Sequence, residues 1–148
     1  MIEELIQDVI SNLIHSFRAP YHNKETFILE EMKASTIKIF DHVARFSEFY
    51  PTIIHHESIM PGFQTKLCNV IKELALKDLQ GAEENHTINK DLQASYQSYA
   101  LLGMIIEWVK SDFKYSTKYM AEQLIYILSC KPISKVYQTS FTTETEQA

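Results

Sequence analysis

The residues that most often carry chemistry in helical proteins are sparse in this sequence. A di-iron helical bundle needs Glu-x-x-His pairs on facing helices, and the one such pair, Glu83 and His86, lies in a polar segment without a partner motif. His55 and His56 are adjacent, so on a helix their side chains point about 100° apart and do not easily share a metal ion. The HExxH, CxxC, P-loop and nucleophile-elbow motifs are all absent. We therefore predict that the protein is not an enzyme and has no catalytic residue, no metal site and no cofactor.

His42 is the histidine whose surroundings leave two readings open. It lies between Ile39 and Phe46 on a mostly apolar stretch, with Ser35 and Thr36 one or two helical turns earlier. In one reading it is a core histidine whose polar atoms are satisfied, or it lies at the edge of the face. In the other it lines a cavity, because small residues leave space and a small-molecule pocket needs a few directional polar groups in an apolar, aromatic wall.

The cysteines, the net charge and the length of the apolar runs restrict the class of protein to which this chain can belong. Cys68 and Cys130 stand in separate segments, as expected for reduced core thiols in a cytoplasmic protein. The N-terminal segment carries acids where a signal peptide needs basic residues, and the longest apolar run, Tyr99–Ile106, falls far short of the roughly 20 residues that span a bilayer. The formal charge is −5 and the basic residues are scattered, so no contact with DNA or with a membrane is predicted for this chain by itself.

Apolar residues recur at helical spacing along the chain, which has three Gly and four Pro in 148 residues. This pattern predicts one all-α domain, a bundle of five or six helices with a single core. Helices are expected at about residues 2–17, 24–49, 51–57, 61–81, 91–113 and 116–130. Residues 1–138 are assigned to the domain and residues 139–148 to a polar C-terminal tail.

In the last two predicted helices, apolar residues cover more of the helix surface than a single core can bury. The helix after residue 90 is apolar nearly all round, which fits either a central helix or a helix at a subunit interface. Gly103 adds to this, because glycine inside a helix costs about 1 kcal/mol against alanine and is usually kept where another backbone comes close. We expect the two helices to form half of an intersubunit four-helix bundle in a symmetric homodimer. The predicted interface residues are Leu101, Met104, Ile105, Trp108, Met120, Leu124, Ile127 and Leu128.

The stretch YALLGMIIEWVKSDFKYSTKYMAEQLIYIL, residues 99–128, resembles the end of the effector-binding domain in the TetR family of bacterial transcriptional regulators. Residues 37–50 are similar to that family's long central helix. The residues that carry the likeness most sharply are Gly103, Glu107, Trp108 and Ser116. Family members begin with a helix-turn-helix domain, and none precedes Met1 here. The resemblance therefore implies a truncated effector-binding and dimerisation domain, TetR C-terminal-like in fold, whose contact with DNA needs an N-terminal domain not present in this chain.

An effector cavity is predicted between the long central helix, the helix beginning at Phe63 and the helix around Tyr99. Faces that mix aromatic with small or polar side chains interdigitate less closely than leucine faces, and the voids between them accept ligands. A largely apolar or aromatic compound would fit, and would modulate DNA binding by the full-length dimer, as a repressor or an activator. The alternative is a helical oligomerisation or protein-interaction module with no small-molecule ligand. The predicted ligand-binding residues are Ser35, Thr36, Ile39, Phe40, His42, Phe46, Phe63, Tyr96 and Tyr99, of which His42 and Tyr99 are expected to make the polar contacts.

Overall fold

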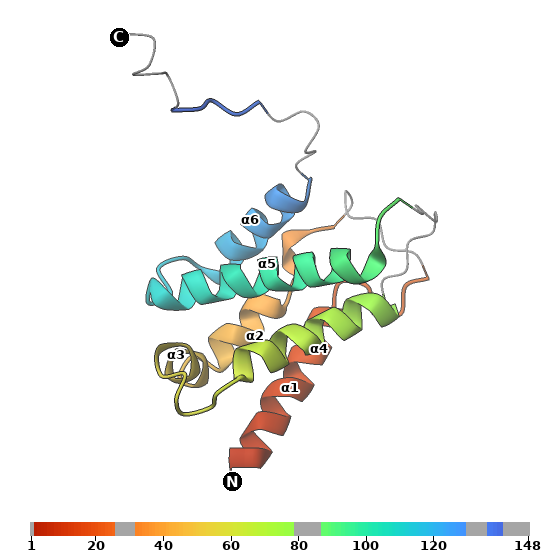
Figure 1. The fold of residues 1–148 in the computed structure, drawn as a ribbon. Helices are drawn as coiled ribbons and strands as arrows, with labels where there is room; N and C mark the ends of the chain where they lie inside the picture. Colours follow the sequence, from red (N-terminus) through yellow and green to blue (C-terminus); the bar gives the residue numbers. More distant parts are fainter. Residues whose placement is uncertain (1, 26–31, 79–86, 130–135, 141–148) are drawn as a thin grey trace, which may run out of the picture.

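The computed structural model describes residues 2–25, 32–78, 87–129 and 136–140, which form an all-helical fold with no strand among them (Figure 1). The α-helices are α1 (Ile2–Arg18), α2 (Ile39–Arg45), α3 (Phe49–His55), α4 (Phe63–Asp78), α5 (Lys90–Lys110) and α6 (Thr117–Ser129). One turn of 3-10 helix, η2 (Ala34–Thr36), precedes α2. The predicted all-α class is confirmed. The predicted tail, residues 139–148, lies mostly outside the described residues.

The helices pack around α2, which contacts both the first and the last of them. α4 runs beside α5, and α3 lies against both. α1 packs on α2 and α4, whereas α6 packs on α2 and η2 (Figure 1). α5 crosses the middle of the molecule, with α4 along one side and α6 rising on the other (Figure 1).

The amphipathic first helix forms as the apolar spacing predicts. Val9 and Leu13 on its inner stripe are completely buried, while Ile2 and Leu5 near its N-terminus remain exposed. α1 ends at Arg18, two residues before Pro20, because the residue before a proline avoids helical geometry.

The single long helix predicted at residues 24–49 is wrong. Within the described part of that range, the backbone is extended at Lys33 (φ −96°, ψ 142°) and at Ile37 (φ −78°, ψ 115°), on either side of η2. Thr36 Oγ1 donates a hydrogen bond of 2.7 Å to the Lys33 carbonyl. Hydroxyl side chains offer such local bonds in competition with the helix, and β-branched residues lose rotamer freedom in it, so the Ser35–Ile37 segment interrupts the helix.

Of the remaining helices, α5 ends at Lys110, three residues before its predicted end, and the others begin close to their sequence signals. Pro51 lies in the first turn of α3, where its missing N–H needs no partner, so the predicted short helix is present and begins two residues earlier. Gly62 has a left-handed φ of +79° just before α4 begins. Ser116 is the N-cap of α6, as predicted, because its Oγ accepts a hydrogen bond of 3.1 Å from the Tyr119 N–H.

Trp108 is the centre of contact between α2, α5 and the bend that leads to α6. Its side chain is 3% exposed, and its ring meets Phe40 edge-on at 5.8 Å and Phe113 edge-on at 5.0 Å between centroids. The indole Nε1–H donates a hydrogen bond of 2.9 Å to the Tyr115 carbonyl. Asp112 and Phe113 in this bend have positive φ values of 59° and 56°, a conformation that non-glycine residues seldom adopt. The packing of Phe113 on the indole helps to hold this conformation in place.

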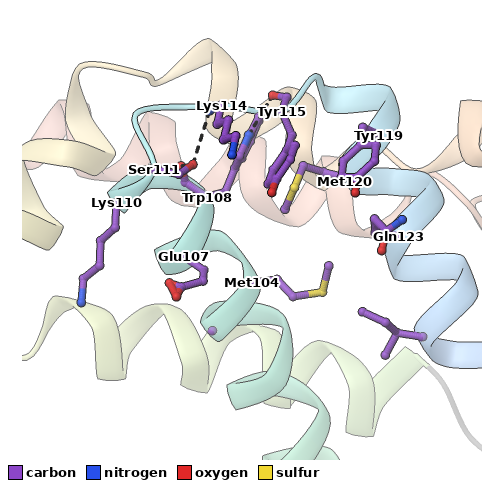
Figure 2. Close-up of a pocket in the computed structure, with 12 residues that line it drawn as sticks. Met104, Glu107, Trp108, Lys110, Ser111, Lys114, Tyr115, Tyr119, Met120 and Gln123 are labelled. Atoms are coloured by element: carbon purple, nitrogen blue, oxygen red, sulfur yellow. Dashed lines mark hydrogen bonds between the residues drawn. The ribbon is translucent and has the colours of Figure 1, made fainter.

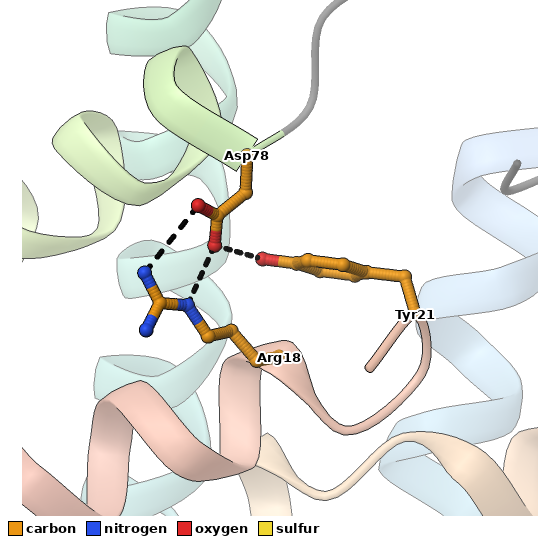
Figure 3. A network of polar contacts seen from close by, with 3 residues as sticks. All are labelled: Arg18, Tyr21 and Asp78. Atoms are coloured by element: carbon orange, nitrogen blue, oxygen red, sulfur yellow. Dashed lines mark hydrogen bonds and ion pairs between the residues drawn. The ribbon is translucent and has the colours of Figure 1, made fainter. Parts of the chain in front are cut away.

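A polar cluster joins the C-terminal ends of α1 and α4 (Figure 3). Arg18 Nε lies 2.7 Å from Asp78 Oδ2, and the Tyr21 hydroxyl donates to the same oxygen at 2.9 Å. The hydrogen bonds from Arg18 hold the pKa of the Asp78 carboxyl below its usual value. The C-terminal end of a helix carries a partial negative charge, which repels a carboxylate. The guanidinium of Arg18 and the hydroxyl of Tyr21 offset this repulsion for Asp78 at the end of α4.

Truncation of the indole tests its central position. We expect Trp108→Ala to lower the free energy of unfolding by about 3 to 5 kcal/mol, because a large buried side chain leaves a cavity that closes only in part. Trp108→Phe keeps most of the volume and loses the hydrogen bond to Tyr115, so a smaller loss of about 1 to 2 kcal/mol is expected. Urea unfolding followed by far-UV circular dichroism measures both. Equal stability of wild type and Trp108→Ala would contradict the assignment.

Candidate functional site

Three helices bring polar side chains together around His42 in the interior. His42 is 1% exposed, and its Nδ1 lies 2.8 Å from Asn12 Oδ1 on α1. Its Nε2 lies 2.5 Å from the Tyr50 hydroxyl on α3. Because an amide oxygen only accepts, Nδ1 carries the proton and donates to Asn12, and Nε2 accepts the hydrogen bond from Tyr50. The imidazole is therefore neutral and both of its nitrogens are satisfied.

The burial of this cluster fixes its protonation. Burial, assisted by the positive charge of Arg45, lowers the pKa of His42 from 6.5 to about 4. Burial also raises the pKa of the Tyr50 phenol. Among the described residues, no buried side-chain nitrogen or oxygen lacks a hydrogen-bond partner. At neutral pH the cluster is thus an uncharged chain of hydrogen bonds.

Aromatic rings surround the cluster on the side of α3 and α4. The Phe46 ring lies 5.2 Å from the His42 imidazole, and Phe49 meets Phe63 edge-on at 5.2 Å. The structure therefore brings together these residues of the predicted ligand set: Ile39, Phe40, His42 and Phe63, all buried, and Phe46, half-buried. They form one packed interior, and its polar partners Asn12 and Tyr50 were not predicted from the sequence. The sequence marks Asn12 and Tyr50 only as polar residues among the apolar neighbours of α1 and α3.

The other predicted ligand residues lie apart from His42. Ser35 is exposed and Thr36 half-buried in η2. Tyr96 and Tyr99 are 78% and 58% exposed on the outer side of α5, which corrects their expected position inside the bundle. The inner side of α5 instead holds smaller side chains that admit α4, such as Ala94 and Ser98, whose Oγ donates to the Ala94 carbonyl at 2.6 Å. The two faces of α5 are therefore exchanged relative to the prediction.

The exchange also redistributes the predicted interface residues. Leu101, Ile105, Trp108 and Met120 are buried within the subunit, Met104 and Leu124 are half-buried, and Ile127 and Leu128 are exposed. The large apolar side chains that do face solvent on these helices are Leu92, Tyr96, Tyr99, Tyr119, Tyr126, Ile127 and Leu128.

An open groove of about 770 Å³ lies between α5 and α6 (Figure 2). Met104, Trp108 and Met120 give it an apolar side, and Figure 2 shows Met104 pointing from α5 towards α6. Tyr115 and Tyr119 stack at its upper end, with ring centroids 4.6 Å apart and an interplanar angle of 23°. The residues that line it are Gly103, Met104, Glu107, Trp108, Lys110, Ser111, Lys114, Tyr115, Tyr119, Met120, Gln123 and Ile127. Sequence reasoning did not select the two tyrosines, although their i, i+4 spacing was a usable signal.

In the described part of the chain, no three His, Cys, Asp or Glu side chains lie close enough to hold a metal ion. None of the helices in this part of the chain is long and apolar enough to cross a membrane. The Glu83 and His86 pair considered from the sequence lies outside the described residues, as does Cys130.

The family model described as a transcriptional regulator C-terminal region, of the TetR class, matches residues 30–130. The chain belongs to the TetR family of transcriptional regulators. The matched range runs from before η2 to the end of α6, so it contains His42, Tyr50 and the groove between α5 and α6, whereas Asn12 on α1 lies outside it. Regulatory regions of this family are generally non-enzymatic. No curated protein and no solved structure matches the chain.

The low pKa of His42 predicts how stability depends on pH. The unfolded chain binds a proton at His42 near pH 6.5 and the folded chain only near pH 4, so acid favours unfolding. Stability is fully present above pH 6.5 and falls by about 3 kcal/mol as the pH drops to 4. Urea unfolding at intervals across this range measures the slope, and the His42 ring resonances in NMR report its midpoint directly. His42→Asn should lose this part of the slope; a variant that keeps it would assign the acid sensitivity to other groups.

Proposed function

We propose that this chain is the dimerisation and effector-sensing region of a TetR-family regulator, and that it pairs through the solvent faces of α5 and α6. The observation that carries the dimer is the amount of apolar side chain left uncovered on these two helices. Tyr96 on α5 and Ile127 on α6, for example, are 78% and 56% exposed. A concentration of exposed apolar side chains on two consecutive helices supports an interaction site there. A two-fold axis lets one patch serve both subunits.

The His42 cluster is the proposed effector site. Its support is the convergence of Asn12, His42 and Tyr50, from three different helices, beside the rings of Phe46 and Phe49. A small apolar or aromatic compound with one polar group could exchange hydrogen bonds with these side chains and displace the ring packing. Such exchange moves α1, α2 and α3 relative to one another, because each helix supplies one partner of the cluster.

Regulation of DNA binding then depends on the full-length dimer. The net charge of −5 opposes phosphate attraction by this chain, so an N-terminal DNA-reading domain is assigned that role. An effector changes DNA affinity only if it binds the DNA-competent and DNA-incompetent arrangements unequally. A rearrangement of α1 against α2 and α3 is the change through which that difference would act.

One observation favours a second candidate, a dimerisation module without a small-molecule ligand. Both ring nitrogens of His42 are already satisfied by protein groups, so the cluster is stable as it stands. The two candidates share the dimer and differ only in whether the interior opens to a compound.

Native mass spectrometry of the gently purified protein separates these candidates. We expect a dimer that retains a small apolar compound, and Tyr50→Phe should retain less of it because the cluster loses its hydroxyl. Tyr137→Phe removes a hydroxyl from an exposed tyrosine outside the helices and is the matched control. If no compound is retained, and none from an aromatic panel raises the melting temperature, the ligand-free module is the better description.

A charged residue on the exposed face of α6 tests the proposed pairing surface. We expect Ile127→Asp to weaken dimerisation at least about tenfold, because the carboxylate would lose water in the interface. Ser129→Asp adds the same charge to an exposed position about 200° around the helix and should leave the dimer intact. Sedimentation velocity over a dilution series gives both dissociation constants. A wild-type monomer at micromolar concentration would remove the dimer proposal altogether.

A further inference from the structure

The residue that ends α2 brings a positive charge to the edge of the His42 cluster. The Arg45 guanidinium carbon lies 5.6 Å from the centroid of the Phe46 ring, and this ring lies 5.2 Å from the His42 imidazole. Arg45 is exposed, Phe46 is half-buried and His42 is buried. The three side chains therefore lead in that order from the solvent to the interior.

Arg45 contacts this ring although the sequence offers it two carboxylates at helical spacing. Asp41, four residues earlier in α2, lies 3.9 Å from Lys38 Nζ instead. Glu48, three residues later, lies beyond the end of α2, so it is not held on the same helix face. In the described part of the chain, no carboxylate oxygen comes within 4.0 Å of the Arg45 guanidinium. The cation has an aromatic partner there and no anionic one.

Arg45 also acts on the interior through its charge. Burial lowers the pKa of His42, and the positive charge of Arg45 lowers it further. The cluster supplies no opposing negative charge, because His42 is neutral and Asn12 and Tyr50 are uncharged at neutral pH. A negatively charged group is therefore favoured beside Arg45, where it would meet a cation next to an apolar ring.

We propose that the effector is an aromatic carboxylic acid, whose carboxylate binds Arg45 while its ring takes the place of the Phe46 ring against His42. This inference rests on the proposed effector site and names the chemical class of its ligand. A guanidinium can donate two parallel hydrogen bonds to one carboxylate, and a flat apolar ring suits a surface on which an aromatic ring already packs. Phe46 follows the last residue of α2 and has a non-helical backbone (φ −104°, ψ 41°), so its ring can move without unwinding that helix.

Other classes of ligand match these residues less well. A neutral aromatic compound would leave the Arg45 guanidinium without an anion, and a cationic compound would be repelled by it. A phosphate ester carries a charge of about −1.5 to −2 at neutral pH, and one guanidinium would leave part of that charge unpaired beside apolar rings, which is unfavourable. A carboxylate has the single charge that one guanidinium balances.

Displacement of the Phe46 ring would act on the position of α3. The Phe46 carbonyl accepts hydrogen bonds from the N–H groups of Phe49 at 3.0 Å and Tyr50 at 3.1 Å. The residue that the ligand displaces therefore belongs to the turn that positions Tyr50, the partner of His42. Binding at Arg45 would change the angle between α2 and α3.

Pairs of compounds that differ in charge but hardly in shape test the carboxylate. Benzoate and naphthoate are compared with benzamide and naphthamide by isothermal titration calorimetry at neutral pH. We expect each acid to bind the wild type at least about tenfold more tightly than its amide, because a charge-assisted hydrogen-bonded pair is stronger than a neutral one. Arg45→Gln should remove this preference and keep the affinity for the amide. Lys90→Gln removes the same charge from an exposed position at the start of α5 and should keep the preference.

The outcomes separate the class of ligand from the effector site itself. If the amides bind as tightly as the acids, or if Arg45→Gln keeps the preference, the carboxylate assignment is overturned while the site remains. If neither the acids nor the amides bind to the wild type, both are overturned.

Removal of the Phe46 ring gives an independent test. Phe46→Ala should have a lower melting temperature than the wild type, and benzoate should raise it more than benzamide does, because benzoate fills the cavity and also pairs with Arg45. Adding Arg45→Gln to Phe46→Ala should make the two compounds equal. Phe17→Ala removes another half-buried ring, on α1, and should gain no more from benzoate than the wild type does. Equal effects of benzoate and benzamide on Phe46→Ala itself would overturn the proposal.

Discussion

Much of this fold depends on one requirement: the indole ring of Trp108 must be buried with its N–H hydrogen-bonded. Trp108 is the only tryptophan, and its indole is enclosed by Phe40 of α2 and by Phe113 of the bend after α5. Its N–H donates a hydrogen bond to the Tyr115 carbonyl, which lies within reach because the chain changes direction between α5 and α6. Burial of the indole therefore fixes which side of α5 faces α2, and also where α6 must begin. The exposure of the opposite side of α5 follows from the same requirement.

This constraint explains what the sequence could and could not reveal. The end of α1 and the starts of α4 and α6 were predictable to within about two residues, because Pro20, Pro61 with Gly62, and the Ser116 cap give local signals. The end of α5 at Lys110, three residues before the predicted end, has no such signal. The inner side of α5 was assigned by aromatic content, which placed Tyr96 and Tyr99 inside. A helix with apolar residues on all sides carries little directional information. The inner side of α5 is instead set by which of its side chains the rest of the fold buries, Trp108 and Ser98 among them.

The interior site was predictable in part, for a similar reason. His42 was recognised as a polar interruption of an apolar stretch, and it is indeed buried, with its imidazole against the rings of Phe46 and Tyr50. Its partner Tyr50 reaches it only because α2 stops at Arg45 and α3 resumes at Phe49, a break that the apolar spacing does not reveal. The break also shows why a continuous central helix was the wrong expectation: the His42 cluster needs the angle between α2 and α3. A fully satisfied polar network of this kind specifies how helices are oriented more than it adds stability.

The bend between α5 and α6 has a consequence for how related chains could diverge. Asp112 and Phe113 hold a left-handed backbone that sets the angle at which α6 leaves α5, and with it the width of the groove. A change of residue in this bend would alter the shape of the groove without altering any side chain that lines α6. In the proposed dimer, the choice of partner would then depend on this bend as well as on the side chains in contact.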